Sequence, residues 1–256
     1  MSDDFEALVM EAEKAARQMK GWDFSFVENR RHTDSHPWDY TEAVCSFLVG
    51  VTDMLDMDTG GGEVLLGLRD RATVWPDRVC ATEGYHPNVA VASRNLKPIG
   101  VEVVECRTSK RLPFEDESFD LIINRHGDYR EPELWRILRS SGMFVTQQIG
   151  FGAKVRFNEM FDGPDPAYNK VTFADVITRF DEAGFEIIDQ REFRGRDIFD
   201  DIGAVVFVLT AAPWEIPGFS VDGYREQLLE LHESIETNGP IDIGVSYTLL
   251  TVRKRG

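Results

Sequence analysis

The chain has 256 residues, of which 42% are hydrophobic, and a formal net charge of −17. This length and composition allow one large domain with a full hydrophobic core. The acidic balance argues against an extended nucleic-acid-binding surface, which needs clustered Lys and Arg. No apolar run approaches the roughly 18 residues that span a bilayer, and the N-terminus is acidic, so we expect neither a membrane helix nor a secretory signal.

Three cysteines, Cys45, Cys80 and Cys106, lie in apolar segments and form no Cys-x-x-Cys pair. This spacing is typical of reduced thiols packed in a core. We therefore expect a cytoplasmic protein.

The first segment predicts an amphipathic helix. Its apolar stripe begins at Phe5 and continues to Met19, and Gly21 ends it. Residues 22–40 are rich in His, Asp and aromatic side chains and predict an irregular connector. Helical spacing resumes over residues 41–49.

Short apolar runs and amphipathic segments then alternate. Strands are expected near residues 53–58, 79–83, 101–106, 119–125 and 142–149, with helices near 63–69, 87–96 and 131–139. Alternation of this kind predicts a parallel sheet with helices on both faces.

The second half of the chain is less regular. Residues 150–170 predict a long loop, which is uncommon unless it has a function. Further elements are a helix at 172–183, a strand at 185–193, a helix at 221–235 and a strand at 245–252. Periodicity does not decide between helix and strand for residues 204–211, because they are apolar almost throughout.

A glycine-rich loop follows the first predicted strand of this sheet. Asp56 precedes Gly60 and Gly62 in the pattern acid-x-x-x-Gly-x-Gly, and Glu83 follows Gly62 by 21 residues at the end of the next strand. Glycine lets backbone N–H groups approach a ligand, and the acid can accept both hydroxyls of a ribose. Leu65 stands where the dinucleotide template has its third glycine, so a nucleoside site is favoured over a pyrophosphate cradle.

This arrangement resembles the first motif of class I S-adenosylmethionine-dependent methyltransferases. Leu112–Asp120 and Glu133–Gly142 are similar to the segments that lead into the fourth and fifth strands of that family, and the resemblance covers roughly residues 38–150. It implies an α/β fold: a Rossmann-like, seven-stranded, mostly parallel sheet with helices on both faces, an antiparallel last strand and an N-terminal helical cover.

The resemblance implies S-adenosylmethionine as the cofactor. The residues it assigns to cofactor binding are Asp56, Asp58, Gly60, Gly62, Glu83, Gly84, Tyr85, Thr108, Ser109, Asn124 and Arg125. Two of them depart from the family pattern. Asp58 stands where the first glycine is usual, which suggests a different loop, and Thr108 stands where an Asp often contacts the adenine. For Tyr85 and Arg125, exposure to solvent is the alternative.

His126 is the predicted catalytic residue, because it follows the fourth strand at the edge of the sheet that faces the methyl group. Asp128 is close enough in sequence to orient it. The alternative is that His126 only bonds to the cofactor or to the loop backbone. A general base is needed only when the nucleophile carries a proton.

Aromatic and amide side chains are the predicted substrate-binding residues. They are Trp38, Tyr40, Tyr129, Gln147, Gln148 and Trp214. Strand alternation should direct one of Gln147 and Gln148 toward the site. Trp214 either lines the substrate pocket or packs in the core.

Two irregular segments, residues 22–40 and 150–170, are expected to cover the acceptor pocket, with Phe157 or Phe161 contributing from the second. His32 and its His and Asp neighbours have the residue types of metal ligands, but we expect a solvated turn and no metal.

The leading hypothesis is a methyltransferase that acts on a small or medium-sized acceptor. An RNA base methyltransferase and a non-catalytic cofactor-binding regulator are the alternatives. The sequence has no internal repeat or linker, so we expect one domain: a helical cap over 1–50, a cofactor-binding half over 51–150 and a substrate-side half over 151–256. The motifs specify the cofactor and leave the acceptor and the oligomeric state open.

Overall fold

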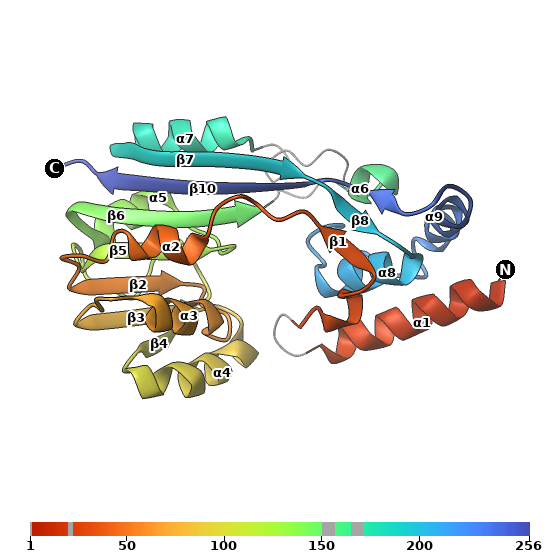
Figure 1. The fold of residues 1–256 in the computed structure, drawn as a ribbon, viewed down its shortest axis with the longest axis horizontal. Coiled ribbons are helices and arrows are strands. Elements are labelled where there is room, and N and C mark those ends of the chain that lie inside the picture. Colours follow the sequence, from red (N-terminus) through yellow and green to blue (C-terminus); the bar gives the residue numbers. More distant parts are fainter. Residues whose placement is uncertain (1, 20–22, 150–156, 165–170) are drawn as a thin grey trace. The chain divides into compact units, whose positions relative to one another are not determined.

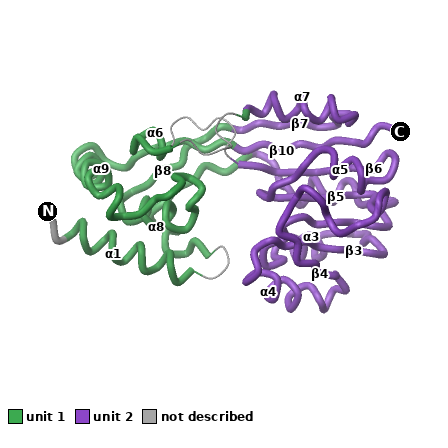
Figure 2. Tube along the Cα trace, turned by 180° about the vertical axis from the view of Figure 1, so that it is seen from behind, with its two compact units in different colours: residues 1–36, 150–171, 194–246 green, residues 37–149, 172–193, 247–256 purple. Residues whose placement is uncertain are grey.

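The computed structural model describes residues 2–19, 23–149, 157–164 and 171–256. Contacts group the chain into two compact units (Figure 2). Unit 1 comprises residues 1–36, 150–171 and 194–246, and unit 2 comprises residues 37–149, 172–193 and 247–256. The organisation as one domain stays a prediction.

The larger sheet has seven strands among the described residues, in the order β4-β3-β2-β5-β6-β10-β7 (Figure 1). Their bounds are β2 Asp53–Met57, β3 Arg78–Glu83, β4 Glu102–Glu105, β5 Phe119–Arg125, β6 Leu138–Ile149, β7 Phe185–Gly195 and β10 Val245–Lys254. The five strands from β4 to β6 pair in parallel, and β10 pairs antiparallel with β6. The predicted fold class, with its antiparallel last strand, is confirmed.

Helices cover both faces of this sheet. They are α2 Tyr40–Cys45, α3 Glu63–Arg71, α4 His86–Leu96, α5 Glu131–Ile137 and α7 Phe173–Glu182, with a 3-10 turn at Lys97–Ile99. Alternate residues of β5, such as Leu121 and Ile123, pack in a core cluster with side chains of α2, α3 and α4. The opposite face carries aromatic contacts, among them Phe144 against Phe180 of α7. Burial on both faces explains why the parallel strands are apolar runs.

Unit 1 combines helices with a small sheet. The helices are α1 Ser2–Gln18, α6 Phe157–Met160, α8 Ile202–Ala211 and α9 Arg225–Asn238, with a 3-10 turn, η1, at Ser25–Val27. The sheet has the strand order β1-β8-β9, with β1 Arg31–Thr33, β8 Asp197–Phe199 and β9 Ile241–Asp242. The N-terminal helix is therefore confirmed, whereas the connector predicted over 22–40 contains a strand.

The centre of unit 1 is α8, whose residues from Ile202 to Leu209 are all buried. A helix that is apolar on every side shows no amphipathic period, which explains why the sequence pattern did not decide its structure. Phe157 and Phe161 belong to the same core cluster as α8. Among the described helices, none has the length and apolar character required to cross a membrane.

Candidate cofactor-binding site

The predicted cofactor residues of unit 2 come together at the carboxyl ends of its parallel strands. Strand register brings Met57 beside Asn124, and Arg125 beside Gln147. Glu83 ends the neighbouring strand β3. In open α/β sheets, ligands bind at this edge, outside the carboxyl ends of the strands.

The loop between β2 and α3 is bent sharply by residues in the left-handed region. Asp58, Gly60 and Gly62 have φ values of 55°, 65° and 89°. At Gly62 a Cβ atom would lie 2.7 Å from Cγ of Leu96. Only glycine fits there, and α3 begins at the next residue, Glu63.

The carboxylate of Glu83 is held by two backbone N–H groups, one from this loop and one from the residues after β3. Its Oε2 accepts a hydrogen bond from the N–H of Gly60 at 2.7 Å, and its Oε1 accepts one from the N–H of Tyr85 at 2.7 Å. Glu83 is only 5% exposed. Because a carboxylate has about four lone-pair sites, both oxygens can still accept hydroxyl groups. The geometry therefore fits an acid that binds a diol and also fixes the loop.

Two further carboxyl groups of this edge resist ionisation. Burial raises the pKa of Asp56 to about 7, and the nearby carboxylates of Asp58 and Glu83 add to the effect. Burial also raises the pKa of Asp58 to about 6, with further contributions from Glu83 and Asp128. Perturbed carboxyl groups of this kind concentrate at functional sites.

Buried polar atoms without partners mark the same edge. Within the described part of the chain, Oδ2 of Asp56, Oγ1 of Thr59 and Nε2 of Gln147 are buried and have no partner in good hydrogen-bond geometry, although Thr59 is near enough to Asp56 to lower its pKa slightly against the effect of burial. Native proteins satisfy nearly all buried polar groups. These atoms fit a site that a polar ligand or its bound water completes. Thr59 was not among the residues expected from the sequence, although its position inside the glycine loop was a signal for it.

Trp38 and Tyr40 are buried beside these groups. The indole Nε1 of Trp38 donates to Oε1 of Gln147 at 2.9 Å, and the Tyr40 hydroxyl donates to the carbonyl of Asn124 at 3.1 Å. Both side chains belong to the core cluster on the α2 and α3 face of the sheet. They form part of the wall beneath the strand ends.

Side-chain hydrogen bonds of Gln148 and Asn124 connect the carboxyl ends of β5 and β6. Nε2 of Gln148 donates to Oδ1 of Asn124 at 2.7 Å and to the carbonyl of Gly127 at 3.1 Å. Nδ2 of Asn124 donates to the carbonyl of Met57 at 3.3 Å, and the residue has no exposed surface. Strand alternation separates Gln148 from Gln147, as expected, and Gln147 is the one that carries an unsatisfied amide nitrogen.

His126 directly follows β5 and is exposed. Its φ of 65° is unusual for a residue other than glycine, and its N–H donates to the carbonyl of Gln147 at 2.9 Å. A strained backbone that carries an exposed imidazole at a strand end is the kind of feature found at functional sites. Arg125 is also exposed, which agrees with the alternative given for it.

The remaining predicted residues have more varied surroundings. Ser109 donates from Oγ to Oδ2 of Asp128 at 2.6 Å, whereas Thr108 is exposed. Tyr85 is 58% exposed. The ring of Tyr129 packs against Phe144, with centroids 5.1 Å apart.

Trp214 belongs to unit 1 and is 47% exposed. The core packing considered for it is therefore wrong. Phe157 and Phe161, expected to help cover the acceptor, are instead packed in the core of unit 1. The rest of the expected cover over residues 150–170 lies mostly outside the described residues.

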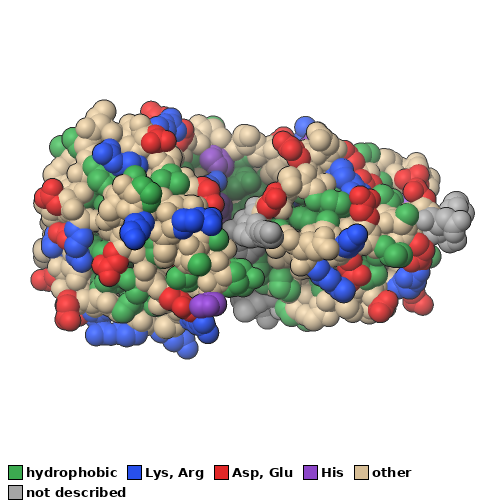
Figure 3. Space-filling view, turned by 90° about the horizontal axis from the view of Figure 1, so that it is seen from below, with side chains coloured by type: hydrophobic (Ala, Val, Ile, Leu, Met, Phe, Trp, Pro, Cys, Tyr) green, Lys and Arg blue, Asp and Glu red, His purple; other side chains and the backbone are tan. Residues whose placement is uncertain are grey.

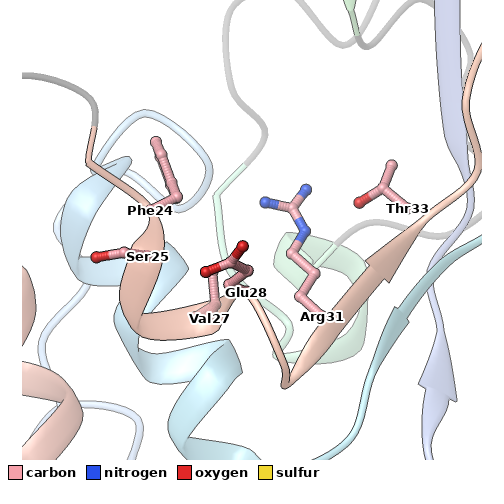
Figure 4. Close-up of a pocket in the computed structure, with 6 residues that line it drawn as sticks. All are labelled: Phe24, Ser25, Val27, Glu28, Arg31 and Thr33. Atoms are coloured by element: carbon pink, nitrogen blue, oxygen red, sulfur yellow. The ribbon is translucent and has the colours of Figure 1, made fainter.

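Unit 1 has an open cavity of about 480 Å³. Figure 4 shows the residues that line it, which come from η1 and the residue before it, from β1 and from the turn between them: Phe24, Ser25, Val27, Glu28, Arg31 and Thr33. The Arg31 guanidinium donates to both oxygens of Asp197, at 2.8 and 2.7 Å. None of the residues that line this cavity is among the predicted cofactor-binding residues.

The cluster considered for metal binding is occupied by ion pairs. Nε2 of His32 lies 2.7 Å from Oδ2 of Asp200, and Asp34 pairs with Arg196. Across the described ranges, no group of three or more His, Cys, Asp or Glu side chains is placed to hold a metal ion.

Comparisons with known proteins identify this architecture. Residues 55–146 match the methyltransferase domain family. No curated protein matches the chain in sequence. A candidate methyltransferase from Bacillus halodurans has a similar structure, with a TM-score of 0.57, 19% identity and coverage of 84% of this chain and 97% of that one.

Two other solved structures differ in their chemistry. The [4+2]-cyclase SpnF has a TM-score of 0.55 at 17% identity, with coverage of 97% of this chain and 93% of that one. A phosphoethanolamine N-methyltransferase from Haemonchus contortus has a TM-score of 0.52 at 14% identity, with coverage of 86% of this chain and 53% of that one. It was solved with phosphomonomethylethanolamine and S-adenosylhomocysteine. At these identities the likeness shows the fold. The matched segment shows a methyltransferase domain over residues 55–146, and the solved structures show that the chain as a whole has the fold of known methyltransferases.

Proposed function

We propose that unit 2 binds S-adenosylmethionine at the carboxyl edge of its sheet and that the chain transfers the methyl group to a small-molecule acceptor. The observation that carries this proposal is the buried carboxylate of Glu83, which accepts one hydrogen bond from the N–H of Gly60 in the glycine loop and one from the N–H of Tyr85 after β3. The unsatisfied buried atoms of Asp56, Thr59 and Gln147 support it, because a polar ligand placed there would give them partners.

Each part of the cofactor has a counterpart in this chain. Glu83 would accept the ribose hydroxyls, and the loop from Asp58 to Gly62 would face the methionyl half. Backbone groups near Thr108 and Ser109 would contact the adenine. When bound, the cofactor supplies a methyl group activated by its sulfonium, so the protein mainly has to align the acceptor and exclude water.

His126 is the proposed general base for an acceptor that carries a proton. It follows β5 at the edge where Glu83 and Asp56 lie, and its backbone is fixed by the bond to Gln147. Imidazole changes its protonation near neutral pH, which suits proton removal. Trp38 and Gln147 support this position from the α2 and α3 face.

The charge of the chain supports a small acceptor. Its net charge is −17, and on the face seen in Figure 3 Lys and Arg side chains are interspersed with Asp and Glu. Nucleic-acid binding draws its affinity mainly from clustered cations. A relative with the same fold was solved with phosphomonomethylethanolamine, an acceptor of the proposed size.

Two measurements test the proposal in sequence. Calorimetric titration with S-adenosylhomocysteine should show saturable binding to the full chain. Radiolabelled methyl transfer should then appear with pooled small amines, phenols and carboxylic acids, and not with total RNA. Absence of binding would refute the cofactor assignment, transfer to RNA alone would favour an RNA methyltransferase, and binding without transfer to either pool would favour a regulator.

A further inference from the structure

Asp58 is the residue at which this chain departs from the glycine loop of its superfamily. It stands at the position of the first glycine and adopts a φ of 55°. The left-handed conformation costs an L-residue on the order of 1 kcal/mol, although Asp tolerates it better than most. This chain therefore has the Asp58 side chain at a position where glycine would cause less backbone strain.

The Asp58 carboxylate fills a space left by two other glycines. A Cβ atom on Gly127 would lie 2.5 Å from its Oδ2, and a Cβ atom on Gly84 would lie 3.8 Å from its Oδ1. Gly84 follows β3 and Gly127 lies two residues after β5. The carboxylate therefore lies between the loops that follow these two strands, inside the proposed cofactor site.

The charges around Asp58 are negative. Burial, Glu83 from β3 and Asp128 from the loop after β5 disfavour its ionised form, and a hydrogen bond from the backbone N–H of Asp128 opposes them only in part. Asp58 in turn disfavours the ionised form of Asp56 in β2. A carboxylate surrounded by carboxylates is stabilised by a bound cation. Independently, Asp56 is only 3% exposed and its Oδ2 lacks a hydrogen-bond partner among the described residues.

The cofactor carries two cationic groups, a sulfonium and the α-ammonium of its methionyl half. Of these, only the ammonium has N–H donors that can bond to a carboxylate. We propose that Asp58 accepts a hydrogen bond from the α-ammonium group of the cofactor, a contact that the usual glycine cannot make. This inference rests on the proposed cofactor site and gives this chain a residue that selects ligands with an intact amino-acid half.

The test compares two neutral-sulfur ligands that differ in that half. S-adenosylhomocysteine has the α-ammonium, and 5′-methylthioadenosine lacks it. Both are titrated calorimetrically at pH 8, above the raised pKa of about 6 of Asp58, into the full chain and into Asp58→Asn and Asp58→Gly. Loss of one charge-assisted hydrogen bond should weaken S-adenosylhomocysteine about tenfold in both variants. The affinity for 5′-methylthioadenosine should change less than twofold.

Two controls keep the result specific. Asp58→Gly suits the left-handed backbone, so it separates loss of the carboxylate from distortion of the loop. Glu105→Gln removes a carboxylate at the end of β4, the strand beyond β3, where Arg107 and His86 already pair with it, and should leave both affinities within twofold.

The inference is overturned if both ligands weaken by the same factor, or if neither weakens in Asp58→Asn. Failure of the wild-type chain to bind S-adenosylhomocysteine would instead refute the proposed function. The two failures are therefore distinguishable in one set of titrations.

Discussion

The two ends of strand β2 carry the same type of side chain in opposite electrostatic surroundings. At the amino end, Asp53 accepts from Arg78 at 2.5 Å and from Arg139 at 2.7 Å, and Arg139 also donates to Asp120 at 2.9 Å. Burial raises the pKa of Asp120, but the hydrogen bonds from Arg139 and Thr52 outweigh burial and lower it to about 2.

At the carboxyl end, Asp56 and Asp58 are surrounded by other carboxylates and have pKa values of about 7 and 6. The amino end is satisfied by cations of the chain itself, which is what a structural network requires. At the carboxyl end, no Lys or Arg of the described residues forms an ion pair with Asp56 or Asp58, although Arg130 pairs with Asp128, and we infer that the missing cation comes from the ligand. Charge balance thus separates the end that stabilises the fold from the end that binds.

The largest expected effect is that of Glu83→Ala on cofactor binding. The variant removes the acceptors for the ribose and also releases the N–H groups of Gly60 and Tyr85. Binding of S-adenosylhomocysteine should weaken by on the order of 2–4 kcal/mol in calorimetry. Glu83→Gln keeps one carbonyl oxygen and should lose less. Unchanged affinity in Glu83→Ala would remove Glu83 from the site.

The next effect is a dependence of the stability of the ligand-free chain on pH. Because the pKa values of Asp56 and Asp58 are raised on folding, the native state binds more protons than the unfolded state above the ordinary value of 3.8. Their contribution to stability is full below that pH and is lost as the pH rises through about 6 for Asp58 and about 7 for Asp56.

Urea titrations at pH values from 5 to 8 should show this loss. Each group lowers the free energy of unfolding by on the order of 1 kcal/mol per pH unit within its window. Asp56→Asn should flatten the profile up to pH 7. An identical slope in wild type and variant would show that Asp56 titrates normally.

A smaller effect is expected from Arg139→Ala at the other end of the strand. The variant leaves Asp53 and Asp120 with fewer cationic partners, but Arg139 is partly exposed, so solvent screens the loss. Stability should fall by about 1–2 kcal/mol. The exposed pair Arg191–Asp189 provides a matched control, Arg191→Ala, which should cost less than about 0.5 kcal/mol. A tenfold loss of S-adenosylhomocysteine affinity in Arg139→Ala would contradict the separation of the two ends.

The smallest expected effect on binding is that of His126→Asn. Asn tolerates the left-handed backbone at this position, so the loop should remain intact. If His126 is the base, the affinity for S-adenosylhomocysteine should change less than twofold, whereas methyl transfer to an acceptor found in the pooled screen should fall about a hundredfold. A marked loss of affinity would support the alternative that His126 only contacts the cofactor.

Most of the larger sheet was predictable, because parallel strands buried on both faces are apolar runs bounded by turns. Predicted strands such as 119–125 and 79–83 agree with β5 and β3 to within a residue. The strands of unit 1 were not predicted. Each has only two or three residues, which is too short to show a period.

The candidate site was predictable where it follows a linear motif. Asp56 lies on β2, the glycines lie in the loop that follows it, and Glu83 ends the adjacent strand β3, all within 28 residues of sequence. The bond between Trp38 and Gln147 joins residues 109 positions apart, and no local pattern encodes it. The hydrogen bond from the N–H of Gly60 to the Glu83 carboxylate was also unpredictable, because a backbone N–H is present at nearly every residue and leaves no signal in the sequence.

Proton release on ligand binding would show whether the α-ammonium of the cofactor neutralises the carboxylates of Asp56 and Asp58. S-adenosylhomocysteine is titrated calorimetrically at pH 6.5 in two buffers with different ionisation enthalpies, which reports the protons exchanged. If the α-ammonium compensates the carboxylates at the carboxyl end of β2, their pKa values of about 6 and 7 fall on binding and protons are released. We expect net release in the wild type and a smaller release in Asp58→Asn. Proton uptake, or binding without any proton exchange, would contradict it.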